Sequence, residues 1–349
     1  MQFRSDNYGP AHPKVMEAVV AANSGYDVSY GADAPMERVT ALVREIFGAP
    51  EAAVYLVATG TAANVLALGT LTQPWQTVFC TPHAHIAVDE CNAPEFFTGG
   101  AKLTLVGEAD KMSAEGLREV MAPVENRGVH GAQRGPVSIT NTTELGRCYS
   151  VDEVAAIAKV AHGFDQPLYM DGARLGNAVA ALGCSPADLT TRAGVDAVSI
   201  GGTKNGCLGV EAVVFFDPAK AWEFELRRKR GAHLFSKHRF LAAQMEAYLL
   251  DGLWLETAAE ANARCARLAE GLDTVPGAEF LHRPEANAAF VSLPRETHRR
   301  LRAGGGHYYL WDADDAELAQ DGGPLLARMV CDWSLPESEI DRFVALARG

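Results

Sequence analysis

Short apolar segments alternate with helix-like segments along the first 216 residues, and this alternation restricts the fold more than any other feature of the sequence. Seven apolar segments occur, at 53–58, 77–80, 102–106, 136–140, 167–170, 196–200 and 212–216. Segments with helical spacing or small residues occur at 36–47, 62–71 and 150–162. Strands that are apolar throughout need cover on both faces, which is typical of a mainly parallel sheet between layers of helices. The sequence therefore predicts an α/β domain.

The pattern changes after about residue 240. Helices are predicted at 242–255 and 258–272, and strands at 288–293, 307–310 and 327–333. A last helix is expected to begin at a cap formed by Ser334 and Glu337. Several strands followed by a helix favour a small α+β domain, and 349 residues suit two domains at roughly 100–200 residues each. We place the boundary near residue 245, giving domains 1–245 and 246–349, and expect residues 1–20 to return to the small domain.

The charge balance restricts the class of partner. The chain has 31 Lys and Arg against 44 Asp and Glu, a formal net charge of −13, which argues against nucleic acid and against an anionic membrane surface. No window approaches the roughly 18 apolar residues of a membrane span, and the N-terminus has no apolar leader. Seven dispersed cysteines without a CxxC motif indicate free thiols. We expect a cytoplasmic protein with a small-molecule ligand.

Residues with distinctive chemistry follow three of the predicted strands. Gly60 and Thr61 open a helix whose free N–H groups suit a phosphate, although a tight turn onto a buried helix explains them as well. Asp171 ends a second strand, where a lone Asp is more often a helix cap. Lys204 lies among glycines after a third strand, where an exposed loop lysine is the common alternative.

The combination of these strand ends is more specific than any one of them. In a parallel sheet the carboxyl ends of the strands form the ligand-binding edge. A lysine there can hold an aldehyde as an imine, a carboxylate can keep a pyridine nitrogen protonated, and a helix N-terminus can hold a phosphate. Lys204, Asp171 and Gly60 together therefore suit pyridoxal phosphate.

With further motifs, the chain resembles the low-specificity L-threonine aldolases, within the threonine aldolase and aromatic amino acid β-eliminating lyase group of fold type I pyridoxal phosphate enzymes. The resemblance covers nearly the whole chain and rests on Arg4-Ser5-Asp6-Asn7, Tyr30-Gly31, Thr59-Gly60-Thr61-Ala62-Ala63-Asn64, Ala84-His85, Asp171-Gly172-Ala173-Arg174, Gly202-Thr203-Lys204 and Arg328. It implies a seven-stranded, mainly parallel sheet in a large domain, a small α+β C-terminal domain, and a homodimer or homotetramer with active sites at subunit interfaces.

The resemblance also implies roles for individual residues. Lys204 would form the imine, Asp171 would pair with the ring nitrogen, and His85 would stack on the ring and assist proton transfer. The implied cofactor-binding set is Gly60, Thr61, His85, Asp171, Arg174, Thr203, Lys204 and Lys237. The implied substrate-binding set is Ser5, Tyr30, Arg174 and Arg328, with the arginines on the substrate carboxylate. For Lys237, which belongs to a basic segment, a solvated surface is the alternative.

The sequence departs from the family pattern at one place. Many relatives carry Asn-Thr-His after the strand that ends at Thr140, whereas this chain reads Asn141-Thr142-Thr143-Glu144. The missing histidine leaves the base for the β-hydroxyl proton open, and Glu144 or a water held by His85 is our candidate.

The implied reaction is retro-aldol cleavage of L-threonine, L-allo-threonine and related β-hydroxy-α-amino acids to glycine and an aldehyde, in threonine catabolism or glycine synthesis. The alternatives are an aldolase for phenylserine-like substrates, a pyridoxal phosphate-dependent β-eliminating lyase and a non-catalytic regulator, although no DNA-binding segment is attached. An NAD-binding dehydrogenase would require a GxGxxG motif after a strand, which is missing. His83 and His85 offer only two metal ligands, and no metal is predicted.

Overall fold

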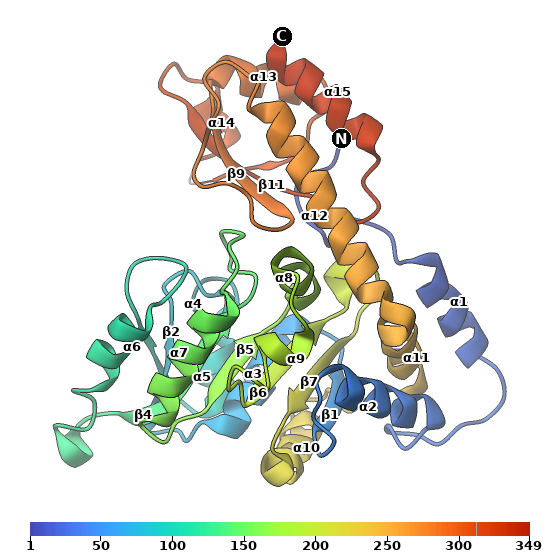
Figure 1. Cartoon of the computed structure of the whole chain (residues 1–349), viewed down its shortest axis with the longest axis vertical. Helices are drawn as coiled ribbons and strands as arrows, with labels where there is room; N and C mark the ends of the chain where they lie inside the picture. Colours follow the sequence, from blue (N-terminus) through green and yellow to red (C-terminus); the bar gives the residue numbers. More distant parts are fainter. Residues whose placement is uncertain (312) are drawn as a thin grey trace.

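The computed structural model describes residues 1–311 and 313–349, which form two lobes joined by a long helix (Figure 1). The larger lobe contains a seven-stranded sheet in the order β1-β7-β6-β5-β4-β2-β3. Its strands are β1 (Ala53–Val57), β2 (Gln76–Cys80), β3 (Lys102–Leu105), β4 (Gln133–Thr140), β5 (Leu168–Asp171), β6 (Ala197–Gly201) and β7 (Glu211–Phe215). Only β7 runs antiparallel to its neighbours, β1 and β6. All seven predicted strands and the α/β class are confirmed.

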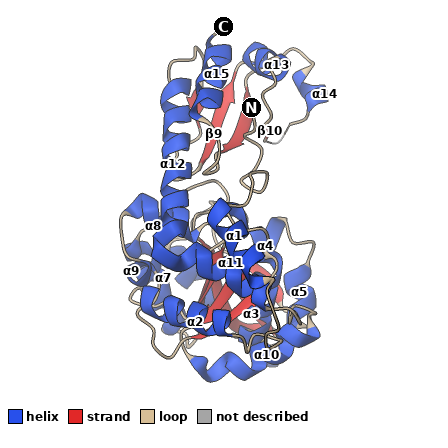
Figure 2. Cartoon of the chain, turned by 90° about the vertical axis from the view of Figure 1, so that its right-hand side faces the viewer, coloured by secondary structure: helices blue, strands red, loops and turns tan. Residues whose placement is uncertain are grey.

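Helices cover both faces of this sheet, as Figure 2 shows. They are α1 (Pro13–Ala22), α2 (Ala34–Ile46), α3 (Gly60–Leu71), α4 (His85–Val88), α5 (Ala93–Thr98), α6 (Ala114–Met121), α7 (Val151–His162), α8 (Leu175–Leu182), α9 (Pro186–Leu189), α10 (Ala221–Arg230) and α11 (Arg239–Leu249). Neighbouring residues of a strand point to opposite faces, so Val57 belongs to the same apolar cluster as residues of α3 and α10, whereas Leu56 belongs to the cluster that includes residues of α2, α7 and α8. Helix α3 is buried from Ala62 to Thr70, which explains its lack of charge.

The smaller lobe contains a four-stranded antiparallel sheet in the order β10-β11-β9-β8. Its elements are β8 (Glu279–Phe280), β9 (Ala288–Leu293), β10 (Tyr309–Leu310), β11 (Leu325–Val330), α12 (Leu253–Leu272), α13 (Arg295–Ala303), α14 (Asp315–Leu318) and α15 (Glu337–Arg348). Both chain termini lie in this lobe (Figure 1), where Phe3 is buried in the same core as Val291 and Phe343. In the described part of the chain, no helix has the length and apolar character needed to cross a membrane.

Two predicted helix boundaries in the smaller lobe are wrong. The break between the two long helices lies at Asp251 and Gly252, both with left-handed φ (54° and 74°), and not at residues 256–257. Ser334 does not cap α15, because its N–H and hydroxyl both donate to Oδ1 of Asp332 (2.7 and 2.6 Å). Pro336 takes the N-cap position instead. In both cases a turn formed within the loop takes precedence over the helical pattern.

Helix α12 connects the cores of the two lobes. Trp254, in its first turn, packs in the core of the larger lobe, whereas Cys265 and Leu268 pack in the core of the smaller one. At the N-terminus, Phe3 joins the smaller lobe, but α1 packs on α11 of the larger lobe. A domain boundary near residue 245 stays a prediction, and we propose that the division falls within α12.

Candidate active site

Gly60, Asp171 and Lys204, which the sequence pattern singled out, all lie at the carboxyl edge of the large sheet. Gly60 follows β1, Asp171 ends β5, and Lys204 lies in a short 3₁₀ turn, η2 (Thr203–Asn205), after β6. Strands β5 and β6 are parallel neighbours, and β1 is separated from β6 only by β7. The topology therefore brings these three strand ends to one edge of the sheet.

Asp171 is a buried and fully oriented carboxylate. Its Oδ1 accepts the N–H of Ala173 (3.0 Å), and its Oδ2 accepts Nδ2 of Asn64 (2.9 Å). The N-cap position of α8 is taken by Arg174, so Asp171 is not the cap of that helix. Gly172 allows the close packing here, because a Cβ would lie 2.0 Å from the carbonyl oxygen of Ser199.

His85 belongs to the same hydrogen-bonded network. Its Nδ1 lies 2.7 Å from Oε1 of Glu90, and that oxygen also accepts Nδ2 of Asn64 (2.8 Å). Asn64 in turn accepts the hydroxyl of Tyr169 on its Oδ1 (2.8 Å). Burial and the neighbouring Asp171 raise the pKa of Glu90 above its usual value, although His85 and Asn64 oppose this. The amide of Asn64 thus joins Asp171 to the partner of His85.

The N-terminus of α3 has open space in front of it. Thr59 caps the helix by accepting the N–H of Ala62 (3.1 Å), and the first helical hydrogen bond is donated by Ala63. Gly60 has no left-handed φ, and a Cβ placed on it would meet nothing within 4 Å. The turn by itself therefore does not require glycine at this position. Space together with free N–H groups at a helix N-terminus suits a phosphate.

Hydrogen bonds to Glu211 and Val210 hold the loop that carries Lys204 in place. Glu211 accepts the N–H of Gly202 on Oε2 (2.9 Å), and Thr203 accepts the N–H of Val210 (3.2 Å). Burial raises the pKa of Glu211 to about 7. Among the described residues, the Nζ of Lys204 has no hydrogen-bond partner, and its side chain is half-buried. The loop is therefore fixed while its amine remains available.

The two predicted carboxylate-binding arginines have different surroundings. Arg174 donates Nε and Nη2 to the two carboxylate oxygens of Asp6 (2.7 and 3.0 Å), and Asn287 donates to the same Asp6 (3.1 Å). Burial opposes ionisation of Asp6, but Arg174 and Lys204 hold its pKa at about 2. Arg328 lies on β11, and its buried Nε has no hydrogen-bond partner among residues 1–311 and 313–349; burial and then the charge of Arg174 lower its pKa. Arg328 is therefore the better placed of the two to receive a carboxylate.

Glu144 lies in the loop after β4, half-buried. Its charge contributes to raising the pKa of both His85 and Arg174, which places it beside the site. Thr143, the preceding residue, donates its hydroxyl to Oδ2 of Asp110 (2.5 Å) instead. Glu144 is thus the ionisable side chain that this loop brings to the site.

The remaining predicted residues, Ser5, Tyr30 and Lys237, make contacts outside the network of Asp171 and His85. Ser5 accepts the N–H of Asn7 on its Oγ (3.1 Å). Tyr30, at φ 64°, is exposed and lies under Nζ of Lys229, 5.2 Å from the ring centre. Its N–H donates to Ser236, next to the exposed Lys237. Within the described chain, no hydrogen bond joins Tyr30 or Lys237 to Asp171 or Lys204.

Sequence reasoning assigned no role to Asn64, Glu90, Asp6 or Glu211. A weak signal was present for two of them. Asn64 is a polar residue in a stretch without charges, and Glu90 lies just beyond its end, five residues after His85. Asp6 and Glu211 acquire their partners only through tertiary packing, so neither could be found from local spacing.

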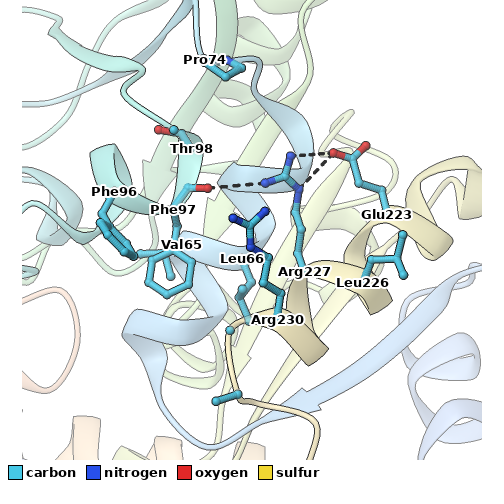
Figure 3. A pocket seen from close by; sticks show the side chains of 13 residues that line it. Val65, Leu66, Pro74, Phe96, Phe97, Thr98, Glu223, Leu226, Arg227 and Arg230 are labelled. Carbon is cyan, nitrogen blue, oxygen red and sulfur yellow. Dashed lines mark hydrogen bonds and ion pairs between the residues drawn. The ribbon is translucent and has the colours of Figure 1, made fainter.

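A cavity of about 810 Å³ lies away from this edge, between α3, α5 and α10 (Figure 3). Val65, Phe96, Phe97 and Leu226 contribute apolar side chains to it. Figure 3 shows Arg227 bound to Glu223 and to the carbonyl of Phe97 at its wall. None of the predicted site residues lines this cavity, so we do not assign the candidate active site to it.

Pyridoxal phosphate fits the residues at the sheet edge. The open space before Gly60 suits the phosphate, and Asp171 is an ionisable group held in place for a ring nitrogen. Lys204 offers an amine that has no hydrogen-bond partner among the described residues. Within residues 1–311 and 313–349, no group of three or more His, Cys, Asp or Glu side chains is arranged to hold a metal ion.

Comparison with known proteins agrees with this arrangement. The family model described as β-eliminating lyase matches residues 2–295. The low specificity L-threonine aldolase of Pseudomonas aeruginosa is 40% identical over 99% of this chain and 96% of its own length. A threonine aldolase structure from Leishmania major has a TM-score of 0.91 and 26% identity, covering 99% of this chain and 98% of that one. A structure of SPT with PLP shares the fold alone, with a TM-score of 0.68 and 17% identity over 99% of this chain and 86% of that one. This chain belongs to the β-eliminating lyase family and, within it, groups with the low-specificity L-threonine aldolases.

Proposed function

We propose that this protein is a pyridoxal phosphate-dependent aldolase that cleaves L-threonine, L-allo-threonine and related β-hydroxy-α-amino acids to glycine and an aldehyde. The observation that carries the proposal is the buried Asp171, oriented by Asn64 and Ala173 at the sheet edge where Lys204 also lies. The 40% identity to a low specificity L-threonine aldolase over nearly the full length supports the same reaction.

Each residue has one task in this proposal. When bound, the cofactor supplies an aldehyde that reacts with amines and a conjugated ring that withdraws electrons from the Cα–Cβ bond. Asp171 would hold a proton on the ring nitrogen of the bound cofactor, and Lys204 would supply the amine that binds its aldehyde. Gly60, Thr61 and Thr203 hold the phosphate, for which a helix N-terminus is a suitable anion site. Arg328 receives the substrate carboxylate together with Ser5 and with Tyr30 of the neighbouring subunit, and Arg174 supports it from its pair with Asp6.

Cleavage requires a base for the β-hydroxyl proton. Glu144 is our candidate, since it is half-buried and its charge acts on His85. His85, partly open to solvent, is the other group that can accept this proton directly or through a water. The choice between them bears on the threo or erythro preference.

We also propose an oligomeric state and a cellular compartment for this protein. We infer a homodimer or homotetramer in which Tyr30 and Lys237 of one subunit complete the site of the next. Support comes from their exposure and from the link between their loops through Ser236. Seven free cysteines support a reducing cytoplasm, where the enzyme would act in threonine catabolism or glycine formation.

The first test is the reaction itself. The purified holoenzyme is expected to release glycine and acetaldehyde from L-threonine and from L-allo-threonine, and Lys204→Ala to abolish this release and the borohydride-fixed chromophore. Lys220→Ala serves as the matched control, because Lys220 is an exposed lysine in the turn that follows β7. Ammonia and a keto acid as products would instead establish a β-eliminating lyase, in line with the family description. Cleavage confined to phenylserine would establish the aryl-specific aldolase.

A further inference from the structure

The ring of His85 has one buried and one open side. Its Nδ1 faces Oε1 of Glu90 at 2.7 Å, and the Glu90 side chain is 0% exposed. Its Nε2 lies 3.5 Å from Asp89, whose side chain is 80% exposed. The two nitrogens therefore meet different environments, and the one facing the accessible side is Nε2.

Glu90 is itself held by Asn64. The amide nitrogen of Asn64 donates one hydrogen to Glu90 (2.8 Å) and one to Asp171 (2.9 Å). Its oxygen accepts the hydroxyl of Tyr169 (2.8 Å). If the amide were flipped, its oxygen would lie against the carboxylate oxygens of Glu90 and Asp171, and neither of these could donate a hydrogen bond to it. The orientation of Asn64 is thereby determined, and Oε1 of Glu90 acts as an acceptor toward it.

We propose that Glu90 is a positioning residue that keeps the proton of neutral His85 on Nδ1 and leaves Nε2 as the proton acceptor. An imidazole is more basic than a carboxylate, so the hydrogen shared between them resides on the ring. A carboxylate that orients a histidine in this way fixes its tautomer. Asn64 extends the arrangement by tying the same carboxylate to Asp171. The reaction that Nε2 serves rests on the proposed function, but the tautomer does not.

Four carboxyl groups determine how easily His85 takes a second proton. Glu90 and Asp89 come from its own turn, Glu144 from the loop after β4, and Asp171 from β5. Burial works against the charged ring, but the hydrogen bond to Glu90 and the charges of Glu144, Asp171 and Glu90 together outweigh burial, so the pKa of His85 is raised. Removing the charge of Glu90 therefore lowers this pKa while leaving the other three groups in place.

The test compares Glu90→Gln with Glu95→Gln in the full-length holoenzyme. Glu95 is a half-buried carboxyl on the neighbouring α5, and the hydrogen bonds and ion pairs of His85 go to Glu90 and Asp89 instead, which makes Glu95 the matched control. Two quantities are measured: the ¹⁵N chemical shifts of the His85 ring across pH, and the pH profile of kcat/KM for L-threonine. Cofactor absorbance at equal loading checks that both variants bind pyridoxal phosphate.

In the wild type we expect a protonated Nδ1 and an unprotonated Nε2 above the pKa of His85. Glu90→Gln is expected to lower that pKa by about one unit, to move the acid limb of kcat/KM down by the same amount, and to lower kcat at least about tenfold. Glu95→Gln is expected to match the wild type in all three. A wild-type ring protonated on Nε2 would overturn the proposal even if the variant fails to fold, as would an unchanged His85 pKa in Glu90→Gln. The NMR measurement stands whether or not L-threonine is cleaved, so it separates this proposal from the function.

Discussion

At the scale of single residues, two chemically identical side chains have different surroundings. Arg174 is paired on two nitrogens with Asp6, whereas the buried Nε of Arg328 has no hydrogen-bond partner in the part of the chain that the structure describes. We predict that Arg328→Ala raises KM for L-threonine about ten- to a hundredfold, the effect of losing a charge-assisted hydrogen bond of about 1.5–3 kcal/mol. The carboxylate is bound equally in the ground and transition states, so kcat should change much less. Steady-state kinetics give both constants.

A matched control for this prediction lies on the surface. Arg267 pairs with Asp341 and is half exposed, far from the sheet edge. Arg267→Ala is expected to leave KM and kcat unchanged. An unchanged KM in Arg328→Ala would show that the substrate carboxylate is bound elsewhere, and Arg174 would then be the next residue to test.

At the scale of elements, Gly60 at the N-terminus of α3 can be tested separately for its effect on stability and for its effect on cofactor binding. A methyl group on Gly60 would meet no protein atom, so Gly60→Ala is expected to leave the Tm of the cofactor-free protein within about 2 °C. The same methyl group would occupy the space before the helix N-terminus. We therefore predict at least about tenfold weaker binding of pyridoxal phosphate, measured by absorbance titration, because the phosphate loses close approach to the N–H groups.

Gly323 provides the comparison for this element. A Cβ added to Gly323 would also meet no described atom within 4 Å, and its φ is not left-handed. Unlike Gly60, it lies in the smaller lobe, before β11. Gly323→Ala should change neither Tm nor cofactor affinity. Equal cofactor affinity in Gly60→Ala and the wild type would contradict the placement of the phosphate at the N-terminus of α3.

At the scale of the whole molecule, one buried carboxylate joins three parts of the chain. Asp6 comes from the N-terminal segment, Arg174 from the larger lobe, and Asn287 from the loop before β9 of the smaller lobe. The pKa of Asp6 falls from 3.8 to about 2, since Arg174, Lys204 and Asn287 together outweigh burial. The stability linked to this group is therefore complete above pH 3.8 and is lost as the pH falls through 2, and it amounts to about 2 kcal/mol.

We predict that Asp6→Asn lowers the free energy of unfolding at pH 7, and that its difference from the wild type shrinks between pH 4 and pH 2. Urea denaturation across this range measures the difference. Asp341→Asn, which breaks only a surface pair with Arg267, should differ little from the wild type at any pH. A pH-independent difference for Asp6→Asn would indicate that Asp6 acts by packing and not by its charge.

Much of the fold could be read from local patterns. The strands that end before Gly60, at Asp171 and before Lys204 were predicted within one or two residues, because burial on both faces leaves an uninterrupted apolar run. The break at Gly252 and the start of α15 were not, because they depend on a turn residue competing with the helical pattern.

By itself the sequence determined the order of the elements and the identity of Asp171 and Lys204 as candidates, since these follow from periodicity and from motifs at the ends of strands. His85 became a candidate only through the resemblance to a family. Only the tertiary structure decided that Arg174 is engaged by Asp6, 168 positions away, and that Asn64 joins Asp171 to Glu90. The physical reason is that a buried polar group must find its partner wherever packing brings one, and sequence distance carries no information about that partner.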